Sequence, residues 1–304
     1  MKKYIIIIFL ALLLIFSGCA KKDTNEKIAT YYGGIDGVSI SFKEIAPPDQ
    51  FDQGKEVPVA VLLKNKGEYD IVSGNAKAKI YGINLDTFNL LNEYRGTNGI
   101  LRGKGEFNIE GGEREITFGN LKYDEEIINS RDFEIRARAC YPYQTKTDIP
   151  VCIKSSISEE TGSNVCNIGE EKVTEGTVSG APIQVTSITE KTRGSNQVRF
   201  DIKIENKGAG NVYSNDVTCD QLEDDTVNLQ NKNKIFLEVI NPLDVTCAFR
   251  SGEDSDKGYI ELSNNEAVIS CWVEAQDTYT DYLRLTLSYM YTETTSKKVT
   301  IFEK

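Results

Sequence analysis

Seven cysteines are the residues in this sequence best suited to covalent chemistry. Cys19 stands near the N-terminus, and six others follow: Cys140, Cys152, Cys166, Cys219, Cys247 and Cys271. An even number in an exported chain favours disulfides, with free structural cysteines as the alternative. The chain has no Cys-x-x-Cys motif, so neither a zinc ribbon nor thioredoxin-type chemistry finds support.

Local patterns suggest a pairing of these six cysteines. Cys140 ends one strand-like pattern and Cys152 lies in a short second one, and turn-rich residues between them predict a hairpin joined by Cys140–Cys152. Cys247 and Cys271 share faces with apolar neighbours, which predicts a bridge in the core. Cys166–Cys219 then follows by elimination. Each native bridge would stabilise the fold by about 2–5 kcal/mol.

The inventory of catalytic side chains is poor. The chain contains no histidine, which excludes Ser-His-Asp and Cys-His nucleophiles and removes the commonest ligand of transition metals. Glu110, Glu113 and Glu115 flank a Gly-Gly turn, and paired carboxylates can hydrolyse glycosides. Nothing in the sequence fixes their separation, so a hairpin loop is the favoured interpretation and we predict no enzyme.

Two acidic runs and four tyrosines are weaker candidates for binding. Residues 220–225 and 253–256 offer oxygen ligands for calcium, but neither matches the spacing of a defined calcium loop. We therefore predict no metal and no cofactor. A patch for sugar or protein is conceivable at four aromatic residues, although tyrosine also suits strands: Tyr31, Tyr32, Tyr141 and Tyr143.

Length and charge limit the partners. The 304 residues suggest about two domains. The net charge of -11 argues against nucleic acid, whose binding needs clustered lysine and arginine.

The N-terminus reads as an export signal. Lys2 and Lys3 precede an apolar run from Tyr4 to Phe16, and residues 16–19 (Phe-Ser-Gly-Cys) resemble a lipobox with lipid attachment at Cys19. The run is shorter than a spanning helix needs, yet an uncleaved anchor helix within 1–19 remains an alternative, as does free secretion. Residues 20–32 read as a polar tether. We therefore expect an extracytoplasmic, membrane-anchored protein.

The rest of the chain alternates apolar and polar residues with the period of a β-strand, as in 57–63, 133–139, 198–205 and 283–291. Strands with one apolar face and one solvent-facing side indicate antiparallel sheets packed as a sandwich. We predict an all-β chain with two sandwich domains, at 33–155 and 181–304, joined by a polar linker at 156–180.

A weak repeat supports this division. Residues 57–71 and 198–212 both run an alternating strand into Asn-Lys-Gly. This pattern is similar to CARDB-like and related immunoglobulin-like modules of surface proteins. Further stretches resemble a group of uncharacterised archaeal exported lipoproteins: 37–42, 46–48, 110–113 and 139–143. The resemblance implies two exported immunoglobulin-like modules and supplies no site residues.

Two functions fit these observations. The first is a membrane-tethered binding or structural module at the cell surface, with a protein or a surface polymer as its partner. The second is an accessory lipoprotein subunit of an envelope, secretion or pilus complex. A carboxylate-based hydrolase remains a third and lesser alternative.

Overall fold

The computed structural model describes residues 30–154, 166–193, 196–240, 244–250 and 254–304. These residues form antiparallel sheets, one parallel strand contact and one short α-helix. The sequence prediction of a mostly β chain is confirmed. Within the described ranges, no helix combines the length and the apolar character that crossing a membrane requires. The predicted signal, lipobox and Cys19 lie outside them.

The first half contains β1 (Val38–Phe42), β2 (Gln50–Asp52), β3 (Val57–Asn65), β4 (Lys77–Tyr81), β5 (Arg95–Gly96), β6 (Glu113–Leu121), β7 (Ser130–Lys146) and β8 (Ile149–Ile153). The second half contains β9 (Ile183–Thr192), β10 (Gln197–Asn206), β11 (Asn211–Tyr213), η2 (Gln221–Glu223), α2 (Asp225–Asn231), β12 (Lys234–Val239), β13 (Thr246–Ala248), β14 (Asp254–Ser255), β15 (Lys257–Glu261), β16 (Glu266–Glu274), β17 (Tyr279–Leu283) and β18 (Leu285–Phe302).

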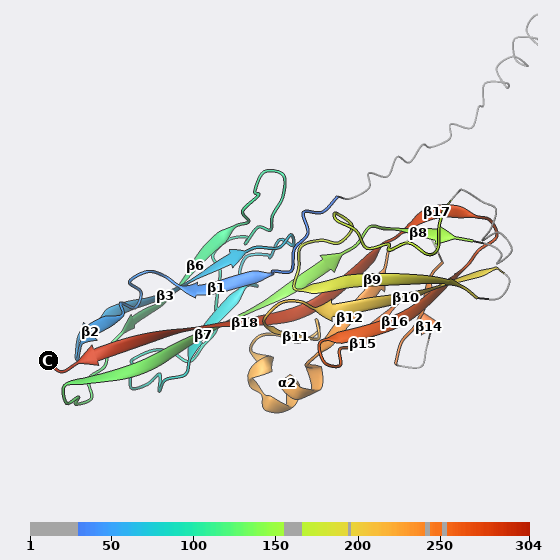
Figure 1. Ribbon diagram of the computed structural model, residues 1–304. Helices are drawn as coiled ribbons and strands as arrows, with labels where there is room; N and C mark the ends of the chain where they lie inside the picture. The colour runs from blue at the N-terminus through green and yellow to red at the C-terminus, as the bar shows by residue number, and fades with distance from the viewer. Residues whose placement is uncertain (1–29, 155–165, 194–195, 241–243, 251–253) are drawn as a thin grey trace, which may run out of the picture.

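The central element of the fold is a long antiparallel ribbon of paired strands. β7 and β18 pair from Ser130↔Phe302 to Lys146↔Thr286, and they run side by side along the length of the molecule (Figure 1). β8 and β17 then pair from Ile149↔Leu283 onward. Both sides of the ribbon advance by three residues between the two stretches, from Lys146 to Ile149 and from Thr286 to Leu283. The register is therefore unchanged and the four strands form one ribbon.

Side chains bridge the short break in this ribbon. The Thr147 N–H donates to the Leu285 carbonyl at 3.0 Å. The Leu285 N–H donates to Thr147 Oγ1 at 2.9 Å, so a hydroxyl replaces a backbone acceptor. Arg284 Nε lies 3.1 Å from Asp148 Oδ1 beside them.

Two equivalent halves are built around this ribbon. Tyr141 pairs with Tyr291 and Tyr143 pairs with Tyr289, which places an approximate two-fold axis at the Pro142↔Met290 pair. β4 then flanks β7 where β12 flanks β18. The small sheet β1-β3-β6 corresponds to β9-β10-β16, which β13 and β14 extend. The two small sheets lie over opposite ends of the ribbon (Figure 1).

The predicted repeat is confirmed by this arrangement. Asn65 pairs with Val38 at the end of β3, and Asn206 pairs with Ile183 at the end of β10. Apolar residues on alternate positions of β10 are fully buried, as its sequence pattern predicts: Val198, Phe200, Ile202 and Ile204. One apolar cluster extends through both halves.

The halves predicted at 33–155 and 181–304 share the long sheet, because β7 belongs to one and β18 to the other. The C-terminal end of β18 even pairs in parallel with β2 of the first half. These two domain boundaries and the linker at 156–180 stay predictions.

Candidate functional site: a capped groove on the long sheet

Three disulfides join the six cysteines beyond Cys19. The predicted Cys247–Cys271 bridge is confirmed, with its cysteines directly opposite on β13 and β16. The predicted Cys140–Cys152 and Cys166–Cys219 pairs are wrong: the chain forms Cys140–Cys219 and Cys152–Cys166. β7 does not turn after Cys140 but continues to Lys146, and β8 pairs with β17. Three disulfides indicate an oxidising, extracytoplasmic location.

The Cys140–Cys219 bridge fastens an insertion to the outer face of the long sheet. We call residues 214–232, which contain η2 and α2, the cap. Its apolar side chains pack against that face around the disulfide: Val217, Leu222 and the part-buried Val227 with Tyr213, Tyr94 and Met290. The Asp224 carboxylate accepts the first free N–H groups of α2, from Thr226 and Val227. At the place in the first half that is equivalent to the cap, a short turn connects Ile71 to β4.

The cap brings an acidic residue of the second half onto basic residues of the first. Glu223 accepts hydrogen bonds from Lys79, from Arg138 at 3.3 Å and from the Tyr94 hydroxyl at 3.1 Å. Lys77 Nζ lies 2.7 Å from Asp220 Oδ2 nearby. Burial, and then the adjacent Glu223 carboxylate, raise the pKa of Tyr94, so its hydroxyl remains a donor. The cap is therefore fixed by a disulfide, an apolar patch and charged pairs.

A groove lies between the cap and the loop that follows β4. It consists of two hollows of about 440 and 620 Å³, which share residues 82–84. Lys79, Tyr81, Arg138 and Glu223 line the first. The second reaches three packed rings, Phe88, Tyr123 and Phe133, whose centroids are 4.9–5.0 Å apart. These volumes fall within the range typical of ligand sites.

A third hollow of about 440 Å³ continues from the second along β7 and β18. It shares Asp132, Phe133 and Glu134 with the second hollow and adds Ser296 and Lys298. β4 covers β7 only from Arg136 to Cys140, so this part of the groove follows the uncovered stretch of β7.

The acidic candidates from the sequence serve structural roles. In the run 220–225, Asp220 and Glu223 bind lysines and Asp224 caps α2. Across the described residues, no group of three ligating side chains could hold a metal ion. Glu253 of the second run lies outside the described residues. Glu110 and Glu115 pair with Lys64 and Lys43 at 3.6 and 2.7 Å, which places them in separate ion pairs.

Two of the four tyrosines of the candidate patch are not available for binding. Tyr141 and Tyr143 point into the core and are buried, while Tyr32 is exposed. The inward phase of Ile135, Ala137 and Ala139 on β7 continues unbroken through both tyrosines.

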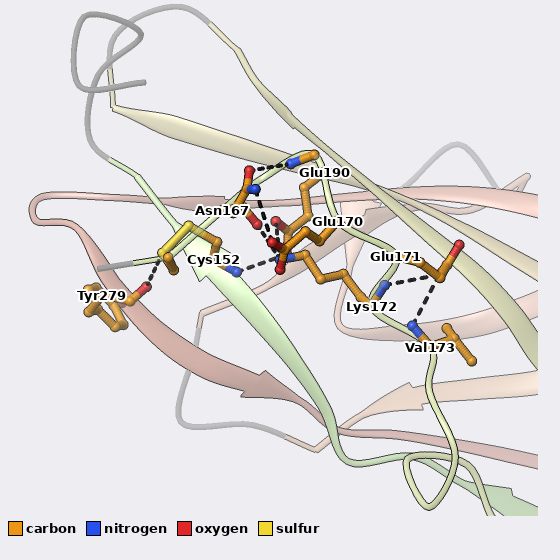
Figure 2. A network of polar contacts seen from close by, with 10 residues as sticks. Cys152, Asn167, Glu170, Glu171, Lys172, Val173, Glu190 and Tyr279 are labelled. Carbon is orange, nitrogen blue, oxygen red and sulfur yellow. Dashed lines mark hydrogen bonds and ion pairs between the residues drawn. A yellow bond between two sulfur atoms is a disulfide. The ribbon is translucent and has the colours of Figure 1, made fainter. Parts of the chain in front are cut away.

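A second polar cluster is a buried contact rather than an open site (Figure 2). The Cys152 N–H donates to Glu190 Oε1 at 2.8 Å, and Lys172 Nζ lies 3.4 Å from Glu190 Oε2. Lys172 also donates to the Asn167 carbonyl. Burial raises the pKa of Glu190 above its ordinary value, against the lowering effects of the Cys152 N–H and Lys172.

The two-fold relationship explains this cluster. Cys152 on β8 is the two-fold equivalent of Thr300 on β18. At Thr300 the parallel strand β2 covers the edge of the ribbon, and the Thr300 backbone N–H donates to the Asp49 carbonyl. The second half runs β9 directly into β10, so the carboxylate of Glu190 takes the place of that strand as acceptor. A buried backbone N–H needs such a partner. The sequence signal was a glutamate two residues after the inward-facing Ile188 on β9, where the alternation predicts a buried side chain.

Comparison with known proteins adds no relative. No protein-family model matches the chain, and no curated protein does either. The groove must therefore be interpreted from its own chemistry.

Proposed function

We propose that this chain is a membrane-tethered extracytoplasmic binding module that acts at the cell surface without catalysis. In this proposal, two immunoglobulin-like sandwiches of the CARDB-like kind are fused through the shared ribbon, and Cys19 carries the lipid. The oxidised cysteines support the location. The capped groove supports binding, because the cap is a large addition to one half and walls the first hollow with Glu223.

A matched pair of bulky substitutions tests the groove. Asn84 is exposed and lines both main hollows, so Asn84→Arg fills the groove without touching the core. Glu238→Arg is the control, since Glu238 on β12 is the two-fold equivalent of Lys79 and lines none of the three hollows. The full chain is cross-linked on intact cells and its partners are recovered. We expect Asn84→Arg to lose them and Glu238→Arg to keep them; equal recovery would place binding elsewhere.

The anchor is tested separately by labelling cells with a lipid probe. Cys19→Ser should abolish the label and release the chain from the membrane fraction. An unlabelled wild-type chain that remains in that fraction would identify an uncleaved apolar helix as the anchor.

One observation favours a second function, as an accessory subunit of an envelope, secretion or pilus complex. A turn formed by the Gly105–Asn108 bridge carries Phe107, whose side chain is 97% exposed, and Ile109 follows it at 67%. Apolar side chains on a projecting turn suit insertion into another protein. Phe107→Ser should then abolish co-purification with a stable complex, whereas Asn84→Arg should not.

A further inference from the structure

We propose that the groove binds a neutral, hydroxyl-rich glycan chain. This rests on the proposed binding function and specifies its ligand. The charges that line the groove carry the first step of the argument. The three hollows contain cations and anions in comparable number: Lys79, Arg131, Arg136, Arg138 and Lys298 against Asp86, Glu125, Asp132, Glu134 and Glu223.

This balance disfavours a polyion. A polyanion would meet the carboxylates and a polycation would meet the guanidinium groups, and like charges brought together are destabilising. Several of the lining charges already neutralise each other, as in Arg136 with Glu134 at 2.9 Å. Sugar hydroxyls both donate and accept hydrogen bonds, so they can be satisfied by guanidinium, carboxylate and the amides of Asn84 and Asn92 alike.

Phe133 at the second hollow supplies the apolar half of glycan recognition. Its ring is part-exposed beneath the polar rim, while the rings of Phe88 and Tyr123 pack behind it and are buried. Tyr81 lines the first hollow. The C–H face of a pyranose ring packs on an exposed aromatic ring of this kind while its hydroxyls reach the polar groups of the rim.

The shape of the groove indicates a polymer rather than a single sugar. The three hollows follow one another because neighbouring hollows share residues, 82–84 in one case and Asp132, Phe133 and Glu134 in the other. An occupant can therefore extend from the cap past the end of β4 and along β7. A chain of linked sugars contacts all three hollows, whereas a monosaccharide contacts one.

Binding to a glycan array tests the proposal, with the purified full chain and neutral, uronate, amino and sulfated oligosaccharides as probes. We expect neutral oligosaccharides to bind, more tightly as they lengthen, and with little dependence on salt. Asn84→Ala and Tyr81→Ala should each weaken binding by about tenfold, and Glu238→Ala should leave it unchanged. Unaltered melting temperatures show that the variants remain folded.

Other outcomes overturn the glycan and distinguish it from the proposed function. Binding confined to charged probes, or binding that Asn84→Ala and Tyr81→Ala leave intact, contradicts a neutral glycan in the groove. If no glycan binds while cross-linking on cells still recovers a protease-sensitive partner through the groove, the ligand is a protein and the binding function stands. Shortening of a bound oligosaccharide would contradict both, since it would reveal a hydrolase.

Discussion

Tyr143 and Tyr291 hold equivalent turns in the two halves of the molecule. The Tyr143 hydroxyl donates to Asn65 Oδ1 at 2.9 Å, and the Tyr291 hydroxyl donates to Asn206 Oδ1 at 3.0 Å. Burial raises the pKa of both tyrosines, so both hydroxyls remain protonated donors. Tyr143→Phe and Tyr291→Phe should each lower the free energy of unfolding by about 1–1.5 kcal/mol, measured by urea denaturation.

The two effects should add in the double variant, because each hydroxyl binds a different turn. Tyr259→Phe is the matched control: its hydroxyl also donates a hydrogen bond, to Asn215 Oδ1 at 2.7 Å, but Tyr259 is exposed. Its loss should cost less than about 0.5 kcal/mol. A double variant no less stable than either single one would contradict independent support of the two turns.

The disulfide of the cap should contribute more to stability than the neighbouring one on β8. Cys140 and Cys219 are 79 residues apart and Cys152 and Cys166 only 14, and a longer closed loop restricts the unfolded chain more. Replacing both members of the pair by alanine should cost about 4–5 kcal/mol for Cys140–Cys219 and about 3 kcal/mol for Cys152–Cys166.

Hydrogen exchange separates the two disulfide variants further. Without Cys140–Cys219, exchange in η2 and α2 should quicken, because the cap then depends on a small apolar patch and exposed ion pairs. Without Cys152–Cys166, exchange in the cap should be unchanged. Equal protection of the cap in both variants would show that the disulfide does not fasten it.

The strands were predictable from the sequence because alternation of apolar and polar residues is typical of a sheet with one buried face. Residues 198–204 alternate and are alternately buried. The length of β7 was harder to predict, since Pro142 and the following polar residues suggest a turn. Proline is tolerated there because Pro142 pairs with Met290 on one side and lies beyond the end of β4 on the other, where no strand needs its missing N–H. Misplacing that turn produced the wrong Cys140–Cys152 pair.

The groove was not predictable from local sequence. Its first hollow depends on Glu223 reaching Arg138, a contact across 85 residues that the Cys140–Cys219 bridge secures. Neither residue belongs to a recognisable sequence motif, and a charged residue on the outer face of a strand usually faces solvent. The rings of the second hollow, Phe88, Tyr123 and Phe133, come from three separate segments that only the tertiary fold brings together.

Glu190 should be needed for its oxygen more than for its charge. Glu190→Gln retains an acceptor for the Cys152 N–H and should stay within about 1 kcal/mol of the wild type, whereas Glu190→Leu should lose about 2 kcal/mol. Denaturation of the full chain measures both. Equal losses in the two variants would show that the carboxylate charge, paired with Lys172, holds this edge of β8.

The pH dependence of the Glu190→Gln comparison has a definite sign. Because burial raises the pKa of Glu190 in the folded chain above the ordinary 4.5, the folded chain binds this proton more tightly than the unfolded chain. As the pH falls through the raised pKa towards 4.5, the wild type should gain stability relative to Glu190→Gln, with no further change below. A gain on raising the pH would contradict the shift.

Glu205 should show the opposite dependence. Side-chain bonds from Lys207 and Lys203 lower the pKa of Glu205 to about 2. The ionised form is thus favoured in the folded chain, so its stabilisation is present above 4.5 and is lost as the pH falls through about 2. Glu205→Gln should lower the free energy of unfolding at pH values above 4.5 by roughly 1–2 kcal/mol, because Glu205 is mostly shielded from solvent.

The Glu205→Gln difference should shrink as the pH approaches 2 and also as salt is added, since the lysines that surround the carboxylate are partly exposed. Glu266→Gln is the matched control, because Glu266 binds the same Lys203 at 2.9 Å but its side chain is half exposed. Its effect at neutral pH should remain below about 0.5 kcal/mol. Urea denaturation at several pH values measures the free energy of unfolding of both variants. Equal decreases would show that the ion pair with Lys207 does not add to the stabilisation by Glu205.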